Sequence, residues 1–304
     1  MIFLDNFIEF IKKQELGSFK ENVSFKTLTT YKTGGTARLV VFPNNIDSLV
    51  EMIKYLKENN ISFKVFGNGS NILASDDFYD GVIIKLTKLN NVEIDDINIE
   101  VEAGYNFTVL CNTVCKKGYT GLEFGCGIPA TVGGAVYMNA GAYLKDISTV
   151  LVKVDILDEN QNIKTLDNKD LDFSYRHSIF MKKDWIILKA YFKLEKGQKN
   201  EILDLIKDRK ERRETSQPLE YPSAGSVFRN PEGMYAGKLI EDCNLKGFKY
   251  NGAEISSKHA NFIINKDNAK SSDILYLMNL AKEKVKEKYN VELYREQELF
   301  NWEK

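Results

Sequence analysis

A glycine- and alanine-rich stretch from Gly125 to Tyr143, GCGIPATVGGAVYMNAGAY, constrains this chain more than any other part of the sequence. Its small side chains cannot build a hydrophobic core alone, and glycine lets the main chain come close to another body. The density of small residues, which ends in Asn139-Ala-Gly-Ala142, favours a loop that lines a flat ligand. A loop with several tight turns and no ligand is the simpler alternative.

Length and charge narrow the class of protein. A chain of 304 residues suggests about two domains, and a hydrophobic content of 43% supports real cores. The 42 basic and 43 acidic residues create no overall field that would attract nucleic acid or an anionic membrane. No apolar run approaches the roughly 20 residues that span a bilayer. The first residues, MIFLDNFIEFIKK, show helical spacing rather than the pattern of a signal peptide. We therefore expect a cytoplasmic protein with neither a nucleic-acid nor a membrane partner.

The cysteines point away from metal or disulfide chemistry. Cys111, Cys115, Cys126 and Cys243 form no CxxC pair, and the chain has only two histidines. Cys111 and Cys115 are four residues apart on a predicted helix, which is typical of two small apolar side chains on one face. We expect reduced thiols and no metal site.

The residue pattern predicts alternating strands and helices. A strand at 36–42, a helix at 47–59 with Asp47 as its candidate cap, and a strand at 63–66 form a βαβ-like unit. Later strands are expected at 81–86, 97–103, 150–157, 163–166, 185–194, 253–255 and 262–264, and helices at 107–117, 200–214, 234–242 and 272–288. A change in composition at Gly197 predicts a domain boundary near residue 198.

A second chemical feature is the turn Gly67-Asn-Gly-Ser-Asn71, which directly follows the predicted strand at 63–66. Successive N–H groups with little side-chain bulk form a concave set of donors, the kind that binds a phosphate. The turn is not a Walker loop, because no Gly-Lys-Ser/Thr follows, and no long helix opens after it as in a GxGxxG motif. Taken alone, the five residues are equally compatible with a plain turn.

Taken together, the motifs resemble those of the bacterial UDP-N-acetylenolpyruvoylglucosamine reductase family. They occur in the family's order and cover nearly the whole chain. The matching stretches are YKTGGTA (31–37), GNGSNIL (67–73), GLEFGCGIPATVGGAVYMNAGAY (121–143), YRHSIF (175–180), QPLEYPSAGSVFRNP (217–231), AGKLIE (236–241), ISSKHANFIIN (255–265) and VELYREQEL (291–299).

The resemblance implies an α+β chain with an FAD-binding fold of the vanillyl-alcohol-oxidase (PCMH) type. An FAD-binding domain would span 1–198, with its two subdomains dividing near 75–80, and a C-terminal α+β substrate-binding domain would span 199–304. The family reduces UDP-N-acetylglucosamine enolpyruvate to UDP-N-acetylmuramate for peptidoglycan synthesis, with FAD as cofactor and NADPH as co-substrate. The short chain is similar to the type II branch.

The resemblance also assigns the cofactor residues. Gly67, Asn68, Gly69, Ser70 and Asn71 would hold the FAD diphosphate through main-chain N–H groups. The residues along the flavin would be Gly125, Gly127, Ile128, Pro129, Thr131, Gly133, Gly134, Asn139, Gly141 and Ala142, and a side chain at Gly133 or Gly134 should do most harm. Some relatives tether FAD to a histidine, but neither His177 nor His259 lies in these stretches, so we expect non-covalent FAD.

Reduction of the enolpyruvyl group places charge on its carboxylate, so cations and donors must be aimed there. Arg176 matches the family's catalytic arginine, and a guanidinium suits a carboxylate because it binds with two N–H groups and stays charged. Ser226 matches the family's proton donor. The alternatives are a structural salt bridge for Arg176 and a plain turn for Ser226, with Ser223 as a nearby competitor.

Glu296 matches the C-terminal catalytic glutamate, with Glu298 as the fallback. The family's usual stretch is Leu-Glu-x-Glu-Val, whereas here Tyr294 replaces the first glutamate and Gln297 the valine. Glu296 is expected to polarise the arginine–carboxylate pair or to deliver a proton.

Tyr175, Asn230 and Lys238 are candidates for binding the UDP part of the substrate. Lys238 opens a helix-like segment, where a diphosphate would meet both an ammonium and helix N–H groups, although a lone lysine is usually just exposed. Two other functions stay open at this point. One is an FAD-dependent oxidase or dehydrogenase of the same fold, and the other is a non-catalytic flavin-binding module.

Overall fold

The computed structural model describes residues 2–302 and divides into two compact units. The first unit comprises Met1–Glu21, Leu39–Asn68 and Asp80–Arg209, and the second comprises Asn22–Arg38, Gly69–Tyr79 and Lys210–Lys304. Each unit has its own hydrophobic core. No helix within residues 2–302 has the length and apolar character needed to cross a bilayer.

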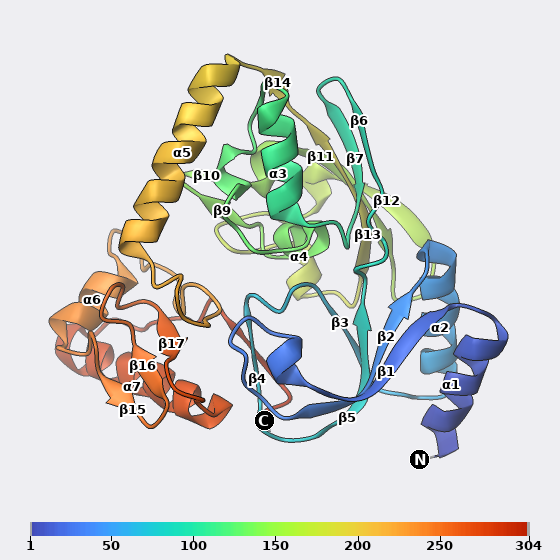
Figure 1. Ribbon diagram of the computed structural model, residues 1–304, viewed down its shortest axis with the longest axis horizontal. Coiled ribbons are helices and arrows are strands. Elements are labelled where there is room, and N and C mark those ends of the chain that lie inside the picture. Colours follow the sequence, from blue (N-terminus) through green and yellow to red (C-terminus); the bar gives the residue numbers. More distant parts are fainter. Residues whose placement is uncertain (1, 303–304) are drawn as a thin grey trace. The chain divides into compact units, whose positions relative to one another are not determined.

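One sheet of four strands runs in the order β1-β2-β5-β3. Its strands are β1 (Gly17–Ser24), β2 (Thr36–Pro43), β3 (Phe63–Phe66) and β5 (Tyr79–Lys85), accompanied by α1 (Ile2–Lys13) and α2 (Ile46–Glu58). Figure 1 shows α1 and α2 side by side next to β1 and β2. Strands β3 and β5 are parallel neighbours, and the strand order places β5 between β2 and β3. The two strands of the expected βαβ-like unit are therefore not direct neighbours.

The first unit also contains a five-stranded antiparallel sheet in the order β12-β11-β13-β7-β6. The strands are β6 (Val92–Asp95), β7 (Asn98–Glu102), β11 (Leu151–Leu157), β12 (Ile163–Asp167) and β13 (Ile186–Lys193). The unit is completed by α3 (Phe107–Lys116), α4 (Val132–Tyr137), β8 (Tyr119–Thr120), β9 (Gly141–Ala142), β10 (Lys145–Asp146), β14 (Glu195–Lys196) and most of α5 (Lys199–Ser216).

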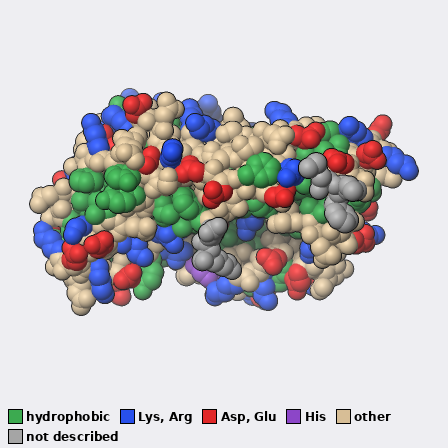
Figure 2. All heavy atoms as spheres, turned by 90° about the horizontal axis from the view of Figure 1, so that it is seen from below, with side chains coloured by type: hydrophobic (Ala, Val, Ile, Leu, Met, Phe, Trp, Pro, Cys, Tyr) green, Lys and Arg blue, Asp and Glu red, His purple; other side chains and the backbone are tan. Residues whose placement is uncertain are grey.

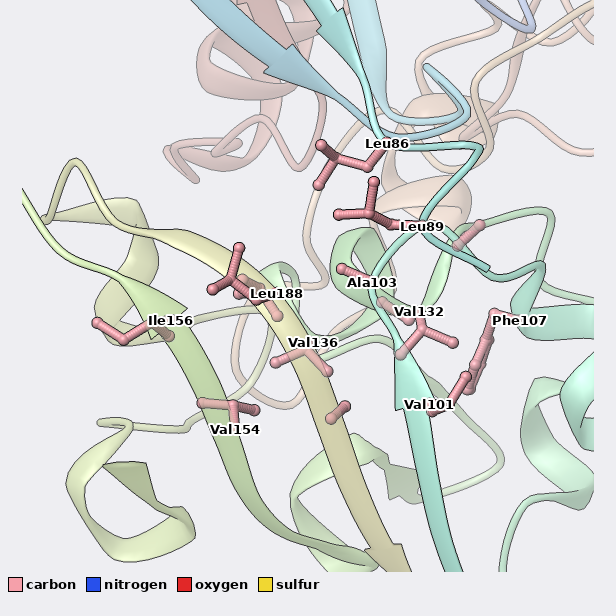
Figure 3. Close-up of a cluster of buried hydrophobic side chains, with 14 of the residues drawn as sticks. Leu86, Leu89, Val101, Ala103, Phe107, Val132, Val136, Val154, Ile156 and Leu188 are labelled. Carbon is pink, nitrogen blue, oxygen red and sulfur yellow. The ribbon is translucent and has the colours of Figure 1, made fainter. Parts of the chain in front are cut away.

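Helix α4 corrects the expectation that the glycine-rich stretch is a loop throughout. Its six residues include Gly133 and Gly134, which have poor helix propensity. Tertiary packing overrides that propensity, because Val132 and Val136 are fully buried and α4 contacts β7 and β13. Figure 3 shows both valines among the side chains of the core, with Ala103 near Val132 and Leu188 near Val136.

The second unit contains a three-stranded antiparallel sheet in the order β15-β16-β17 and a parallel pair of β4 with β18. Its elements are β4 (Ile72–Ala74), α6 (Ala236–Asp242), β15 (Lys249–Tyr250), β16 (Ala253–Ile255), β17 (Ile263–Asn265), α7 (Ser271–Tyr289) and β18 (Glu298–Phe300). Helix α7 packs on β16 and β17 through one apolar face, with Ile274, Leu277 and Met278 fully buried.

The surface matches the balanced composition. On the face drawn in Figure 2, Lys and Arg side chains are interspersed with Asp and Glu.

The cap of α2 differs from the expected residue. Asn45 occupies the N-cap position, and its Oδ1 accepts a hydrogen bond of 2.8 Å from the N–H of Ser48. Asp47 lies inside the first turn and is exposed, so the assignment of the cap to Asp47 was wrong.

We expect Asn45→Ala to lower the free energy of unfolding by about 1 kcal/mol, because it leaves a helix N–H without its acceptor. Asp47→Ala is the matched control and should cost less than half as much, since it removes only a charge near the helix N-terminus. Urea unfolding of the two variants measures the difference. An equal loss of unfolding free energy in both variants would contradict the role of Asn45 as the N-cap.

Candidate functional site

A cavity of about 610 Å³ lies in the first unit, within the range of about 300–1,000 Å³ typical of small-molecule sites. Residues 61–67 and α2 supply part of its wall, and residues 180–187 and α4 supply another part. Four of the sequence-predicted cofactor residues line it: Gly67, Thr131, Gly133 and Gly134. The cavity therefore brings together the turn after β3 and the start of α4.

The two glycines of α4 do different things. A Cβ at Gly133 would lie 2.9 Å from the Cβ of Ala103 and 3.2 Å from its carbonyl oxygen. At Gly134 the nearest atom to an added Cβ would be Thr131 Oγ1 at 3.3 Å. Close approach at Gly133 is thus to the protein's own backbone, whereas Gly134 leaves room in the cavity.

The main-chain N–H groups at the start of α4 donate hydrogen bonds to acceptors within the protein. Val132 N–H donates to the carbonyl of Tyr105 at 2.9 Å, and Gly133 N–H donates to the carbonyl of Ala103 at 2.8 Å. Gly134 N–H donates to the side-chain oxygen of Thr131 at 3.2 Å. These bonds fix α4 on the end of β7, and the N–H groups of Val132, Gly133 and Gly134 are thereby paired within the protein.

That turn offers free donors. Within residues 2–302, the main-chain N–H groups of Gly67, Asn68, Gly69 and Ser70 donate to no protein acceptor. Gly69 has a φ of +66°, and a Cβ there would lie 2.3 Å from the carbonyl oxygen of Leu28. Only glycine fits that position, and the successive N–H groups suit a diphosphate.

A buried lysine supports the first residue of the turn. Lys85, at the end of β5, is only 8% exposed and donates a hydrogen bond to the carbonyl oxygen of Gly67. Burial lowers the pKa of Lys85 to about 8. The lysine was not recognised in the sequence, where it reads as an ordinary strand residue.

Other sequence-predicted flavin residues are engaged by the protein. A Cβ at Gly125 would lie 2.5 Å from Cys111 Sγ, and one at Gly141 would lie 2.4 Å from the carbonyl oxygen of Lys145. Asn139 is buried, its Nδ2 donating to the carbonyl of Ser174 and its Oδ1 accepting from Ser148 N–H, each at 3.0 Å.

Other members of the same segment are less enclosed. Gly127 and Pro129 are exposed, and Ile128 and Ala142 are half-buried. The Pro129 carbonyl accepts a hydrogen bond of 3.3 Å from Asn68 Nδ2, which links this segment to the turn after β3.

Arg176 sits at the tip of a tight turn. Ser174 and His177 exchange two main-chain hydrogen bonds, of 3.2 and 3.1 Å, and Arg176 between them has a φ of +54°. Such left-handed backbone is costly for a non-glycine residue and is found at functional sites. Arg176 Nη2 donates to the carbonyl of Gly141 at 2.5 Å, and its guanidinium lies 5.1 Å from the ring of Tyr175. The exposed Tyr175 and the half-buried Arg176 are thus presented together.

Ser226 and Glu296 come together in the second unit. Glu296 N–H donates to the carbonyl of Val227 at 2.8 Å, and Arg229 N–H donates to the carbonyl of Tyr294 at 2.9 Å. The segments containing the predicted proton donor and the predicted glutamate therefore lie side by side. The carbonyl of Glu296 also accepts a bond of 2.9 Å from the side chain of Asn71.

Two buried amides hold the Ser226 segment in place. Asn261 clamps Phe228, its Oδ1 accepting from the main-chain N–H at 3.0 Å and its Nδ2 donating to the carbonyl at 2.8 Å. Gln297 Nε2 donates to the carbonyls of Ala224 and Gly225 at 3.0 and 3.1 Å. Gln297 Oε1 accepts from the buried hydroxyl of Tyr31 at 2.9 Å. Sequence reasoning noticed Gln297 only as a departure from the family's valine and missed Asn261 and Tyr31.

The substrate candidates of the second unit have local partners. Asn230 Oδ1 accepts from Ala236 N–H at 3.1 Å, which supports the start of α6. Lys238 forms an ion pair of 2.6 Å with Asp242 one turn later, and this partner raises the pKa of Lys238. Both side chains are exposed on this unit.

The fold and the domain match define an FAD-binding protein. The sequence profile of the FAD-binding domain matches residues 37–167. The berberine bridge enzyme from Eschscholzia californica, 14% identical, shares the fold with a TM-score of 0.51 over 64% of this chain and 44% of that enzyme. The predicted two-subdomain α+β FAD-binding fold is confirmed, and so is FAD as cofactor.

The chain belongs to the UDP-N-acetylenolpyruvoylglucosamine reductase family. The profile of that reductase's C-terminal domain matches residues 217–300. The reductase of Caldanaerobacter subterraneus subsp. tengcongensis is 44% identical over 97% of both chains, and that of Clostridium novyi is 45% identical over 94% of this chain and 92% of its own. The crystal structure of the Thermus caldophilus reductase, 31% identical, matches with a TM-score of 0.80 over 93% of this chain and 100% of that chain.

The contrast between the two glycines of α4 can be measured. We expect Gly133→Ala to destabilise the protein by about 1–3 kcal/mol, because the added methyl overpacks Ala103. Gly134→Ala should leave stability unchanged or raise it by up to about 1 kcal/mol through helix propensity. Its methyl should instead weaken FAD binding. Urea unfolding measures the stability of the two variants, and titration of FAD by flavin fluorescence measures their FAD affinity. An unchanged FAD affinity in Gly134→Ala would contradict the assignment of this cavity to FAD.

The buried lysine predicts a pH dependence of stability. Between about pH 8 and 10, Lys85 is neutral in the folded state but still protonated in the unfolded state, which therefore binds more protons. Its contribution makes the free energy of unfolding rise with pH in this window, by at most about 1.4 kcal/mol per pH unit.

In Lys85→Met this contribution to the slope should disappear, whereas Lys64→Met, at an exposed position in β3, should keep it. Urea unfolding at pH 8, 9 and 10 measures the three slopes. Parallel slopes in Lys85→Met and the unchanged protein would show that Lys85 does not titrate there.

Proposed function

We propose that this chain reduces UDP-N-acetylglucosamine enolpyruvate to UDP-N-acetylmuramate for peptidoglycan synthesis, using NADPH and non-covalently bound FAD in the cytoplasm. The observation that carries the proposal is the family relationship over 97% of the chain, which spans both the FAD-binding and the C-terminal domain. Membership in the reductase family also favours a catalyst over a non-catalytic flavin-binding module.

We assign FAD and the UDP-sugar to the two domains that the sequence predicts. Residues 1–198 bind FAD, with the diphosphate on Gly67–Asn71 and the flavin along Gly125–Ala142. Residues 199–304 bind the UDP-sugar, with contributions from Asn230 and Lys238, and Tyr175 adds a contact from the FAD-binding part. The free N–H groups of Gly67 to Ser70 and the cavity beside Gly134 support this assignment of the cofactor.

Bound FAD supplies hydride transfer between two organic molecules, a step that no protein side chain performs. Arg176 binds the carboxylate of the enolpyruvyl group with its guanidinium and stabilises the enolate charge that develops there. The bond to the Gly141 carbonyl and the tight turn hold the guanidinium in one orientation. This preorganisation lowers the cost of arranging the charge during the reaction.

Ser226 donates the proton from its Oγ to the α carbon of the enolate. A serine hydroxyl is a weak acid, so its position against a very basic carbon decides the rate. The clamps from Asn261 and Gln297 fix the main chain on both sides of Ser226 and support this role. Glu296, on the neighbouring segment, polarises the arginine–carboxylate pair or delivers a proton, with Glu298 as the fallback.

The proposal is tested with purified protein under anaerobic conditions. The flavin absorbance band should bleach on addition of NADPH and return only on addition of UDP-N-acetylglucosamine enolpyruvate. Recovery of the band with a simple alcohol-derived ketone, or bleaching with no recovery by the enol ether, would contradict the proposed reaction.

Ser226→Ala separates the two half-reactions. Bleaching by NADPH should persist, whereas reoxidation by the enol ether should slow by about 10²–10⁴-fold, because the proton donor is gone. Ser223→Ala is the matched control and should reoxidise at nearly the original rate. Stopped-flow absorbance of the flavin measures both steps, and rapid reoxidation in Ser226→Ala would exclude Ser226 as the donor.

A further inference from the structure

A second cavity, of about 570 Å³, lies wholly within the second unit and is lined by basic groups. It has no assigned role in the proposed reaction. Its lining consists of Arg229, Lys282, Tyr294, Arg295, Gln297 and Leu299. Among residues 2–302, no carboxylate contributes to this lining. Two arginines and one lysine therefore line a common space without an acid among the lining residues.

Arg229 is the central observation. Its Nε is fully buried and has no hydrogen-bond partner within residues 2–302. A buried N–H of a charged group that lacks an acceptor is costly, so such a group is normally paired. Arg229 is half-buried as a whole. Its main chain is held by a hydrogen bond from its own N–H to the carbonyl of Tyr294. The unpaired Nε marks Arg229 as a charged group that the described protein does not fully satisfy.

The other donors are placed around the same cavity. Arg295 and Tyr294 are exposed residues of the lining, and Lys282 belongs to α7. Lys282 is partly neutralised by Glu292, whose carboxylate lies 3.5 Å from its Nζ. Gln297 lines the cavity without offering a donor to a ligand, because its amide is already bonded to Tyr31, Ala224 and Gly225. The free positive charge thus comes mainly from the two arginines.

We propose that this cavity binds a phosphate group carried by a nucleotide-sized molecule. A planar carboxylate is saturated by one guanidinium, whereas a phosphate offers oxygens to donors that approach from several directions. A dianion also matches two guanidinium groups with a partly neutralised ammonium. The volume exceeds that of a free phosphate and falls in the range of small-molecule sites. The ring of Tyr294, 69% exposed, and the side chain of Leu299 provide apolar surface for the rest of the ligand.

The location ties the site to the chain's reaction. Arg295 directly precedes Glu296, and Arg229 lies three residues after Ser226 on the segment bonded to it. Two sources of the phosphate are compatible with this position, the 2′-phosphate of NADPH and the diphosphate of the UDP-sugar. Only this choice of source rests on the proposed reductase function, since the anion site itself stands on the cavity.

The site is tested by calorimetric titration of the FAD-loaded protein with inorganic pyrophosphate. Arg229→Gln and Arg295→Gln should each weaken pyrophosphate binding at least 10-fold, because each removes a charged donor pair. Lys249→Gln, which removes one exposed charge in the same unit away from the cavity, should bind as tightly as the unchanged protein. Arg295 is exposed, so its variant keeps the test valid even where Arg229→Gln folds poorly.

Equal pyrophosphate affinity in the unchanged protein and in Arg295→Gln, or no pyrophosphate binding at all, would overturn the proposal whether or not the protein is a reductase. If both arginine variants lose binding, the co-substrates identify the source. A rise of the dissociation constant for NADPH but not for NADH assigns the 2′-phosphate, and a rise for the UDP-sugar assigns its diphosphate. If neither changes, the phosphate belongs to a separate nucleotide, and the loss of pyrophosphate binding still supports the site.

Discussion

The first unit depends on the attachment of the α4 main chain to the end of β7. Two hydrogen bonds, from Val132 to Tyr105 and from Gly133 to Ala103, bring a helix with two glycines onto the end of β7. No side chain would allow the approach at Gly133, because its Cβ would collide with Ala103. The same attachment sets Gly134 and Thr131 beside the turn after β3, which creates the wall of the cavity. Close packing of backbone, rather than contact of glycine with a ligand, is therefore what this segment contributes first.

The second unit uses a different device, in which buried side-chain amides replace regular secondary structure. The segment around Ser226 forms only an isolated bridge between Phe228 and Arg295. Asn261 and Gln297 supply the missing order by bonding main-chain groups on both sides of the serine. Buried amides that are fully bonded rigidify their surroundings, whereas a half-bonded one would be costly. The loop that carries Ser226 is thus held by side-chain hydrogen bonds instead of a strand ladder.

Much of the fold could be predicted because periodicity and local signals agree with the structure. Strands β11 and β13 and helix α7 follow the sequence pattern to within about two residues. Helix α4 could not be predicted, since its glycines argue against a helix and only tertiary hydrogen bonds reverse that preference. Strand β1 and strand β6 were missed because charged or polar residues interrupt their alternation.

The residues of the candidate site also differ in how far the sequence alone indicated them. The turn Gly67–Asn71 could be proposed as an anion site from its residue types, because small side chains leave its main chain accessible. Arg176, Ser226 and Glu296 were predicted only through the family resemblance, since arginine, serine and glutamate at lone positions are common. Lys85 and Asn261 gave no signal, because their roles arise from partners that lie 18 and 33 residues away in the sequence.

The left-handed backbone of Arg176 has a consequence for efforts to make such proteins more robust. A glycine or asparagine at this tip would relieve conformational strain of about 1 kcal/mol, so a stability-driven redesign would select either one. The gain would come at the residue proposed to meet the substrate's carboxylate. On the proposed role of Arg176, tolerance to heat and turnover would then change in opposite directions at a single position.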